Sequence, residues 1–218
     1  MLYNNTVIYS IFEGINKMRV ILASKSPRRR ELLSSLSRRL GFSFEIITEE
    51  VDESVEEGVT PYDAVRILAE RKGCAVAMRA DLSDAMVISS DTLVEVEGRA
   101  LGKPIDREDA FKMLTSLSGR GHFVRTGIAV FYRGRAVSDV ASTEVVFRDI
   151  SREEMEEYID SGEPMDKAGA YGIQGGAGKF VKEYHGDFDT VVGLSLALTE
   201  ALMRQAAGEG AFGGNGLD

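Results

Sequence analysis

A strand, a turn and a helix compressed into residues 18–41 constrain the fold more than any other feature of the sequence. The segment "MRVILAS" is apolar and partly β-branched, as expected of a buried strand, and a Ser-Pro pair follows it closely. Ser26 suits the N-cap of a helix and Pro27 its first position, where a missing N–H costs nothing. The apolar positions that recur at helical spacing are Leu32, Leu33, Leu36 and Leu40. Gly41 is a typical C-terminal stop, so the chain begins as an α/β unit.

The first turn of this predicted helix carries the wrong sign of charge. Arg28, Arg29 and Arg30 stand where unpaired N–H groups already make the helix end positive, a place that favours acidic side chains. One interpretation is a phosphate site, because helix N–H groups and guanidinium groups both bind phosphate oxygens. The other is that the arginines are solvated. The stretch by itself favours neither interpretation.

The rest of the chain alternates between strand and helix patterns. The sequence predicts strands over residues 42–47, 85–89 and 93–101, two long strands within residues 123–150, and a hairpin over residues 179–193. It predicts further helices beginning after Thr60, Asp106 and Ser151 and a last helix over residues 194–207. Because long hairpin strands occur beside strand–helix units, a mixed sheet flanked by helices fits better than a purely parallel one.

Composition limits the classes of partner and cofactor. The net charge of −9 gives no broad basic surface, so we expect no nucleic-acid partner. No apolar stretch reaches the roughly 20 residues that span a bilayer, and residues 1–17 lack the pattern of a secretory signal. We therefore expect a cytoplasmic protein without membrane contact. With two histidines and one cysteine, carboxylates would have to hold any divalent metal, which favours Mg²⁺ or Mn²⁺.

The two ends of the chain stand apart from the patterned part. Residues 1–17 precede the first clear strand, and we expect a dispensable extension or a misplaced start there. The glycine-rich residues 208–218 are expected to form a disordered tail. The patterned residues 18–207 are then expected to form a single domain.

Four charged features form a candidate anion cleft. Asp91 is expected just beyond the buried strand over residues 85–89, where it could bind a metal or accept a proton from water. Alternatively, it is a turn aspartate that bonds its own backbone. Lys103 follows in a Gly-Lys-Pro corner, and Lys72 lies on the helix that begins after Thr60. Either lysine alone is typical of a surface charge, but both together with Asp91 and the arginine-rich turn could hold a polyphosphate.

Two further segments are less specific. The acidic residues 49–57 are typical of a solvated loop, although one of their carboxylates could share a metal with Asp91. The stretch "AGAYGIQGGAGK" fails the P-loop spacing, so its glycines would let backbone approach a ligand while Gln174 binds a base edge; a flexible surface loop is the alternative. His122 and His185 are expected at the surface, and Cys74 is expected to pack as a small apolar group.

Four motifs together carry a resemblance to a known family. These are "LASKSPRRRELL", "SSDTLVEVEGRALGKP", "LSGRGHFVRTGIAV" and "EPMDKAGAYGIQGGAGKFV". In order and approximate spacing the chain resembles the Maf-like nucleotide pyrophosphatases over about residues 18–205. The resemblance implies an α/β fold with a mixed sheet, two lobes and a deep central cleft. It also implies hydrolysis of a nucleoside triphosphate to the monophosphate and pyrophosphate with a divalent metal.

The resemblance assigns roles to individual residues. It places the proton-accepting carboxylate at Asp91 and an acidic residue of the loop, taken as a second metal ligand, at Glu53. The other implied catalytic and substrate-binding residues are Lys72, Lys103, Ser24, Ser26, Arg28, Arg29, Thr92 and Gln174. Arg30 lies outside the motif. Arg28, Thr92 and Gln174 fall on positions linked to substrate choice.

The composition of the glycine-rich motif resembles one branch of the family. "MDKAGAYGIQG" is similar to the branch that acts on dTTP and UTP, in a house-cleaning role for which modified pyrimidine nucleotides are further candidate substrates. The alternative is a nucleotide-binding regulator of cell division and septum formation, without enzymatic activity. A general phosphatase is a third interpretation. A homodimer is possible.

Overall fold

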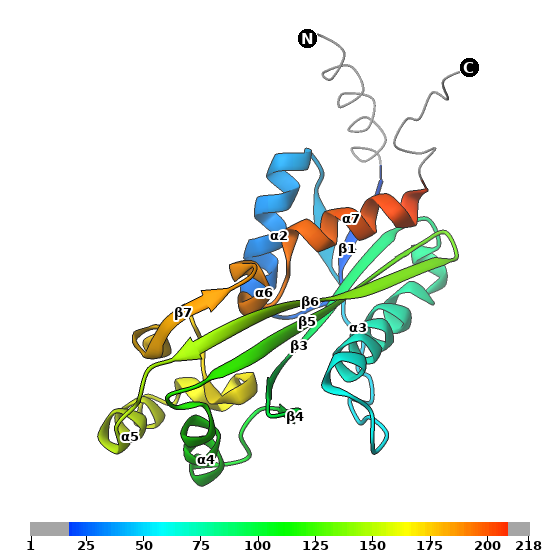
Figure 1. Cartoon of the computed structure of the whole chain (residues 1–218). Coiled ribbons are helices and arrows are strands. Elements are labelled where there is room, and N and C mark those ends of the chain that lie inside the picture. Colours follow the sequence, from blue (N-terminus) through cyan, green and yellow to red (C-terminus); the bar gives the residue numbers. More distant parts are fainter. Residues whose placement is uncertain (1–17, 209–218) are drawn as a thin grey trace, which may run out of the picture.

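The computed structural model describes residues 18–208, where a twisted seven-stranded mixed sheet is flanked by helices (Figure 1). The strand order is β2-β1-β3-β5-β6-β7, with β4 paired to β3 alongside this path. β1, β2 and β3 are mutually parallel where they pair, and every other pair is antiparallel. The predicted mixed sheet is confirmed. The extension at residues 1–17 and the tail beyond Gly208 lie outside the described residues.

The strands are β1 (Val20–Leu22), β2 (Phe44–Ile46), β3 (Met86–Val96), β4 (Arg99–Leu101), β5 (Gly121–Tyr132), β6 (Arg135–Phe147) and β7 (Val181–His185). The α-helices are α2 (Pro27–Leu40), α3 (Pro61–Ala77), α4 (Arg107–Leu117), α5 (Arg152–Asp160), α6 (Phe188–Val192) and α7 (Leu196–Ala207). Short 3₁₀ turns are η1 (Ala80–Leu82), η2 (Glu163–Asp166), η3 (Ala168–Ala170) and η4 (Gly176–Phe180). No helix within residues 18–208 is both long and apolar enough to cross a membrane.

The predicted helix starts are confirmed because each has its capping side chain in place. The Ser26 hydroxyl accepts the N–H of Arg29 at 3.4 Å, and Gly41 ends α2 in the left-handed conformation at φ 75°. At α5 the Ser151 hydroxyl accepts the N–H of Glu154, whose carboxylate accepts the N–H of Ser151 in return. These caps act within a few residues of the chain, so a sequence reveals them.

The predicted end of the strand before Asp91 is wrong. β3 continues through Asp91 to Val96, because β5 pairs with it over residues 87–95 without interruption. What ends near this point is the neighbour on the other side, since β1 pairs only as far as Leu22 with Ile88. Asp91 therefore lies in the middle of a strand, past the end of β1.

The hairpin predicted over residues 179–193 is also wrong. Its first half is β7, but β7 pairs with the distant β6. Its second half is the short helix α6, which begins where the Asp187 carboxylate accepts the N–H of Asp189. An aspartate at this position reads as a turn residue or as an N-cap, and packing against the sheet decides between them.

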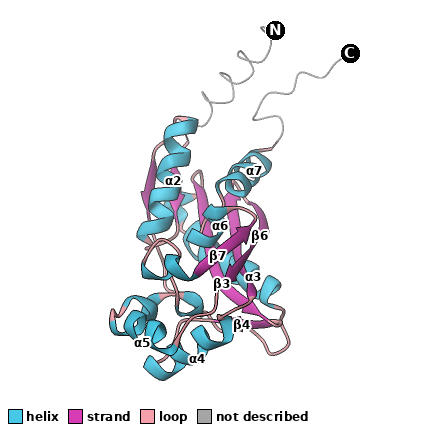
Figure 2. Ribbon diagram, turned by 60° about the vertical axis from the view of Figure 1, so that its left-hand side comes forward, coloured by secondary structure: helices cyan, strands magenta, loops and turns pink. Residues whose placement is uncertain are grey.

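Two hydrophobic cores pack on the same face of the sheet and form two lobes, which Figures 1 and 2 show above and below the sheet centre. On β3, Met86 and Ile88 belong to the core under α2 and α7, whereas Val94 and Val96 belong to the core with α4 and α5. Between them, the same face carries only the hydroxyl side chains of Ser90 and Thr92. α3 covers the opposite face of the sheet.

Candidate functional site

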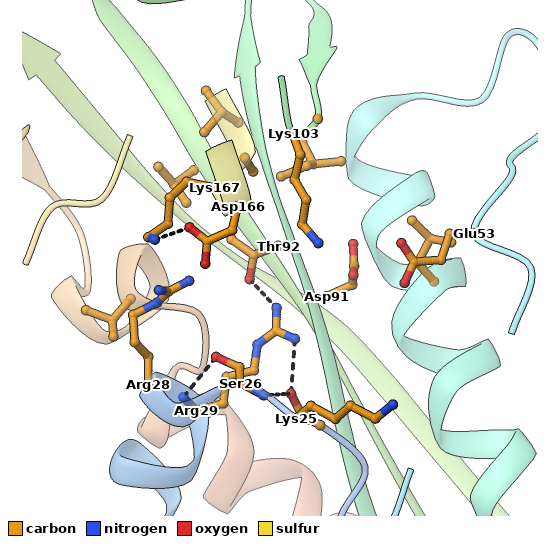
Figure 3. Close-up of a pocket in the computed structure, with 18 of the residues that line it drawn as sticks. Lys25, Ser26, Arg28, Arg29, Glu53, Asp91, Thr92, Lys103, Asp166 and Lys167 are labelled. Atoms are coloured by element: carbon orange, nitrogen blue, oxygen red, sulfur yellow. Dashed lines mark hydrogen bonds and ion pairs between the residues drawn. The ribbon is translucent and has the colours of Figure 1, made fainter. Parts of the chain in front are cut away.

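A cleft of about 1260 Å³ opens beside the middle of β3 (Figure 3). β1 stops pairing at Ile88 and β4 starts at Val94, so among the described strands no neighbour covers this edge of β3 between the two. Because side chains alternate along a strand, Asp91 points to the face covered by α3 and Thr92 to the face of the two cores. The open edge thus gives one cleft access to both faces of the sheet.

The wall on the α3 face is a chain of charges. The Lys72 ammonium lies 2.5 Å from an Asp91 carboxylate oxygen and 2.8 Å from Glu53 Oε1. The hydrogen bond and the charge of Lys72, with the positive charges of Lys103 and Arg29, hold the pKa of Glu53 below its usual range, against partial burial that raises it. The structure brings together the two carboxylates implied as metal ligands, with an ammonium between them.

Close packing of α3 on the sheet brings Lys72 to Asp91. A Cβ on Gly73 would lie 2.4 Å from Ser89 Oγ, and one on Gly127 would lie 2.3 Å from the carbonyl oxygen of Val65. The Ser89 hydroxyl donates to the carbonyl of Ala69 at 2.7 Å. Glycine at these positions therefore sets the distance between helix and sheet, and a larger residue would push α3 away from Asp91.

Lys103 completes this wall from the other lobe. The carbonyl of Gly102 accepts the N–H of Gly169 at 2.9 Å. This bond attaches the Gly-Lys-Pro corner to the core with α4 and α5, which we call the second core. Figure 3 shows the ammonium of Lys103 directed into the cleft towards Asp91. Lys103 forms no ion pair or hydrogen bond with another side chain in residues 18–208, so its charge is available to a ligand.

The wall on the other face is built around Arg29. Its guanidinium donates to the carbonyls of Gly193 at 3.0 Å and Ser90 at 2.9 Å, and to the hydroxyls of Ser24 at 3.4 Å and Thr92 at 3.0 Å. Burial lowers the pKa of Arg29 from its ordinary value. Four of its five N–H groups are therefore used inside the protein. Ser26 lines the cleft beside it as the N-cap of α2.

Arg28 and Arg29 are neighbours with opposite surroundings. Arg28 points into the cleft, and it forms no hydrogen bond or ion pair with residues 18–208 (Figure 3). Across the cleft lies the ion pair of Asp166 with Lys167, and both of these residues line the cleft. Lys167, followed by Arg28, lowers the pKa of Asp166. Arg30 is exposed, as expected of a residue outside the motif.

Lys167 and Asp166 are cleft residues that the sequence reasoning missed. They fall inside the quoted motif "EPMDKAGAYGIQGGAGKFV", but no spacing rule marked them. The Lys167 ammonium is mostly buried and also lies 3.4 Å from the carbonyl oxygen of Glu163. The available signal is the Asp-Lys pair itself, which directly precedes the glycine run.

The glycine run lines the cleft with residues 171–175. Gln174 lines the cleft from a turn in which the N–H of Gly175 bonds the carbonyl of Gly172 at 3.0 Å. Tyr171, just before this turn, is buried and its hydroxyl lies 2.8 Å from Nε2 of His122. The stretch is therefore anchored to buried side chains at Tyr171, whereas Gln174, Gly175 and Gly176 are exposed.

Two minor predictions are also corrected. His122 is 2% exposed and packs edge-on against Phe147 and Tyr171, and burial lowers its pKa to about 4. The sequence placed it at the surface, but it alternates onto the core face of β5. Cys74 is exposed on α3 instead of packed. His185 is exposed as predicted.

The comparisons with known proteins identify the family. A family model described as Maf-like protein matches residues 19–206. The chain belongs to this family. The match includes every cleft residue described above.

Relatives in the Maf family share most of the chain. A dTTP/UTP pyrophosphatase of Pelotomaculum thermopropionicum is 45% identical over 188 residues, which cover 85% of this chain and 95% of the relative. One of Moorella thermoacetica is 48% identical over 187 residues, covering 85% and 93%. Among solved structures, a HAM1 protein from Coxiella burnetii aligns over 87% of this chain and 100% of its own at 15% identity, with a TM-score of 0.47.

Proposed function

We propose that this Maf-family protein hydrolyses dTTP and UTP to the nucleoside monophosphate and pyrophosphate. The observation that carries the proposal is the position of Asp91 at the open edge of β3, between lysines on one wall and arginines on the other. Its relatives at 45% and 48% identity are named dTTP/UTP pyrophosphatases. Modified pyrimidine nucleotides are further candidates, in a house-cleaning role in the cytoplasm.

In the mechanism we propose, charge neutralisation positions the triphosphate. Arg28 and Lys103 project into the cleft without side-chain partners of their own, so they bind phosphate oxygens. Arg29 supports this arrangement by donating hydrogen bonds to the Ser90 carbonyl at the edge of β3 and to the Thr92 hydroxyl. Catalysis of phosphoryl transfer is largely positioning and charge stabilisation, which such a cleft supplies.

Asp91 is the proposed proton acceptor. Lys72 contacts one of its carboxylate oxygens and fixes the orientation of the group. The other oxygen can accept a proton from a water molecule that attacks one phosphorus of the α–β anhydride in line with the bridging oxygen. The bond from that phosphorus to the bridging oxygen breaks as the new P–O bond forms, which gives the monophosphate and pyrophosphate. Lys72 is in this account a positioning residue, since it acts through Asp91.

The donor set fits a divalent cation that is shared with the substrate. Within residues 18–208 there is no group of three or more His, Cys, Asp or Glu side chains able to hold a metal, but Asp91 and Glu53 both contact one ammonium. Mg²⁺ typically uses one or two carboxylates together with substrate phosphates, and Mn²⁺ accepts the same ligands. We propose that Asp91 and Glu53 would hold such an ion, which when bound would lower the pKa of water in the site and stabilise charge on the phosphates.

A panel of nucleotides tests the proposal. Purified protein with Mg²⁺ or Mn²⁺ is expected to release pyrophosphate from dTTP and UTP at rates at least tenfold above those for dCTP, dATP and dGTP. Binding of dTTP without release of any product would instead favour the nucleotide-binding regulator. Release of inorganic phosphate would favour a general phosphatase.

A further inference from the structure

Gln174, the side chain proposed to bind the base, lies on a turn that is held in place by side chains from outside the turn. Gln174 is the third residue of the turn closed by the Gly175 N–H and the Gly172 carbonyl, and its side chain is exposed in the cleft. An isolated glycine-rich turn would sample many backbone conformations. A defined position for Gln174 therefore needs contacts from outside the turn.

Two side chains supply these contacts on both sides of Gln174. The Tyr158 hydroxyl accepts the N–H of Gly172 at 3.1 Å and donates to Glu163 Oε1 at 3.0 Å. The second carboxylate oxygen of Glu163 accepts the N–H of Gly176 at 2.9 Å. The carboxylate and the phenol thus link the two ends of the turn in one chain of hydrogen bonds, which we call the turn clamp.

The glycines of the turn make room for this carboxylate. A Cβ on Gly175 would lie 1.9 Å from Glu163 Oε1, and one on Gly172 would lie 3.1 Å from the same atom. A Cβ on Gly176 would lie 3.1 Å from the ring of Tyr158. The glycine run therefore admits a side chain of the protein itself, which differs from the approach to a ligand expected from the sequence.

The turn clamp includes a buried aromatic side chain. Tyr158 is 3% exposed, packs edge-on against Phe180 with ring centroids 5.5 Å apart, and burial raises the pKa of its hydroxyl above the ordinary value. Because α5 carries Tyr158 and η2 carries Glu163, the clamp ties the turn to the second core. The cleft residues around Asp91 take no part in it.

We propose that Glu163 and Tyr158 are positioning residues that determine base selectivity by fixing Gln174 and the neighbouring backbone. This inference rests on the proposed function, because it concerns the base of the same nucleotide. Uracil and thymine present an N–H between two carbonyl oxygens, whereas cytosine presents an amino group and an unprotonated nitrogen. A Gln amide that rotates freely can exchange the positions of its donor and acceptor and so match either base. Selection between uracil or thymine and cytosine therefore needs a turn whose own N–H and C=O groups are fixed.

Glu163→Gln and Tyr158→Phe test the inference. Glutamine keeps the volume but has one acceptor oxygen for two donors, and phenylalanine keeps the packing but removes the hydroxyl. Each variant is expected to raise KM for dTTP about 5- to 10-fold, with kcat within about threefold of wild type. The preference for dTTP over dCTP, measured as the ratio of kcat/KM values, should fall by a similar factor. Because the two side chains form one chain of bonds, the double variant should be little worse than either single one.

Glu157→Gln is the matched control, since Glu157 is largely exposed on α5 and its ion pair with Lys179 is long at 3.8 Å. It should leave KM and selectivity unchanged. Circular dichroism and thermal unfolding establish that each variant is folded. Folded clamp variants that keep the wild-type KM and selectivity would overturn the inference, as would an equal loss of kcat for all nucleotides.

Binding of dTTP and dCTP in an Asp91→Asn background separates this inference from the proposed function. Calorimetry should show weaker selection in the clamp variants even where no product forms. Equal selection with and without the clamp would overturn the inference whatever the activity. Absence of turnover in the wild type would overturn the proposed function alone.

Discussion

The two walls of the cleft are built on consecutive residues of β3, yet they differ in how their charges are satisfied. On one face, Arg29 has four of its five N–H groups bonded within the protein and burial lowers its pKa. On the other face, one ammonium, that of Lys72, serves two carboxylates, and the Glu53 side chain is 61% exposed. Arg29 is therefore a fixed scaffold in the first wall, whereas the charges of the second wall can exchange their partners with a ligand.

This difference separates structural charge from functional charge. A guanidinium that bonds the Ser90 carbonyl at the open edge of β3, and the Gly193 carbonyl at the end of α6, supplies a donor that a neighbour strand would otherwise provide. Carboxylates that share one cation keep oxygens available for water or a metal. Strand alternation places both kinds of charge within reach of one substrate, because the edge of β3 is open between β1 and β4.

The largest expected effect is the loss of turnover on substitution of Asp91, in the wall whose charges can exchange partners with a ligand. Asp91→Asn keeps the shape of the side chain and its contact with Lys72, but it removes the proton acceptor. We expect turnover of dTTP to fall by about two orders of magnitude or more, with dTTP binding within a few-fold of wild type. Initial rates of pyrophosphate release and calorimetry measure the two quantities. Undiminished release would show that the reactive carboxylate lies elsewhere.

Arg29→Ala should act mainly on stability. The change leaves the carbonyl of Ser90 without its donor, and the carbonyl of Gly193 keeps only the Ser90 hydroxyl. We expect the free energy of unfolding to fall by about 3 kcal/mol, with loss of activity. Urea unfolding measures this loss.

Arg28→Ala is the matched comparison for Arg29→Ala. We expect stability within about 0.5 kcal/mol of wild type but a KM raised about tenfold, because Arg28 has no internal hydrogen bond among residues 18–208. Equal effects of the two substitutions on stability would contradict the division between scaffold and ligand contact.

Glu53→Gln should weaken the binding of the divalent metal. We expect the Mn²⁺ concentration for half-maximal activity to rise about tenfold, with activity restored at saturating metal. Titration of activity with Mn²⁺ measures this shift. Glu56→Gln, an exposed residue of the same loop, is the control and should behave as wild type. An unchanged metal requirement in the Glu53 variant would remove Glu53 from the metal site.

A further effect is expected from His122, which packs in the core with α4 and α5, and it concerns stability alone. Burial lowers its pKa to about 4 in the folded state, so the unfolded state binds the extra proton between pH 6.5 and 4. The stability contributed by neutral His122 is therefore complete above pH 6.5 and lost as pH falls towards 4, by about 2 kcal/mol between pH 7 and pH 5. Urea unfolding at the two pH values measures this loss.

His122→Gln keeps an acceptor for Tyr171 and should abolish most of this pH dependence. His185→Gln should retain it, because the His185 side chain is exposed. If the two variants respond equally to pH, His122 is not the source of the effect.

Local signals in the sequence predicted much of this structure. Helix caps such as Ser26, Thr60 and Asp106 act within a few residues and were read correctly. The mixed sheet followed from the combination of long hairpin strands and short strand–helix units. The charges at Asp91, Lys72 and Lys103 were expected to meet, and the structure lines one cleft with them.

Signals that depend on distant partners were missed. The continuation of β3 through Asp91 is fixed by its pairing with β5, and the turn at Asp187 became an N-cap because α6 packs on the sheet. His122 looked like a turn residue until strand alternation placed it in a core. The glycines near Gln174 admit Glu163, a contact that sequence spacing does not encode.

The identity of the products of dTTP hydrolysis tests the central claim most directly. The wild-type protein, incubated with dTTP and Mn²⁺ and followed by ³¹P NMR, is predicted to give dTMP and pyrophosphate in equal amounts. The appearance of dTDP and inorganic phosphate, or intact dTTP in the presence of demonstrated binding, would contradict it.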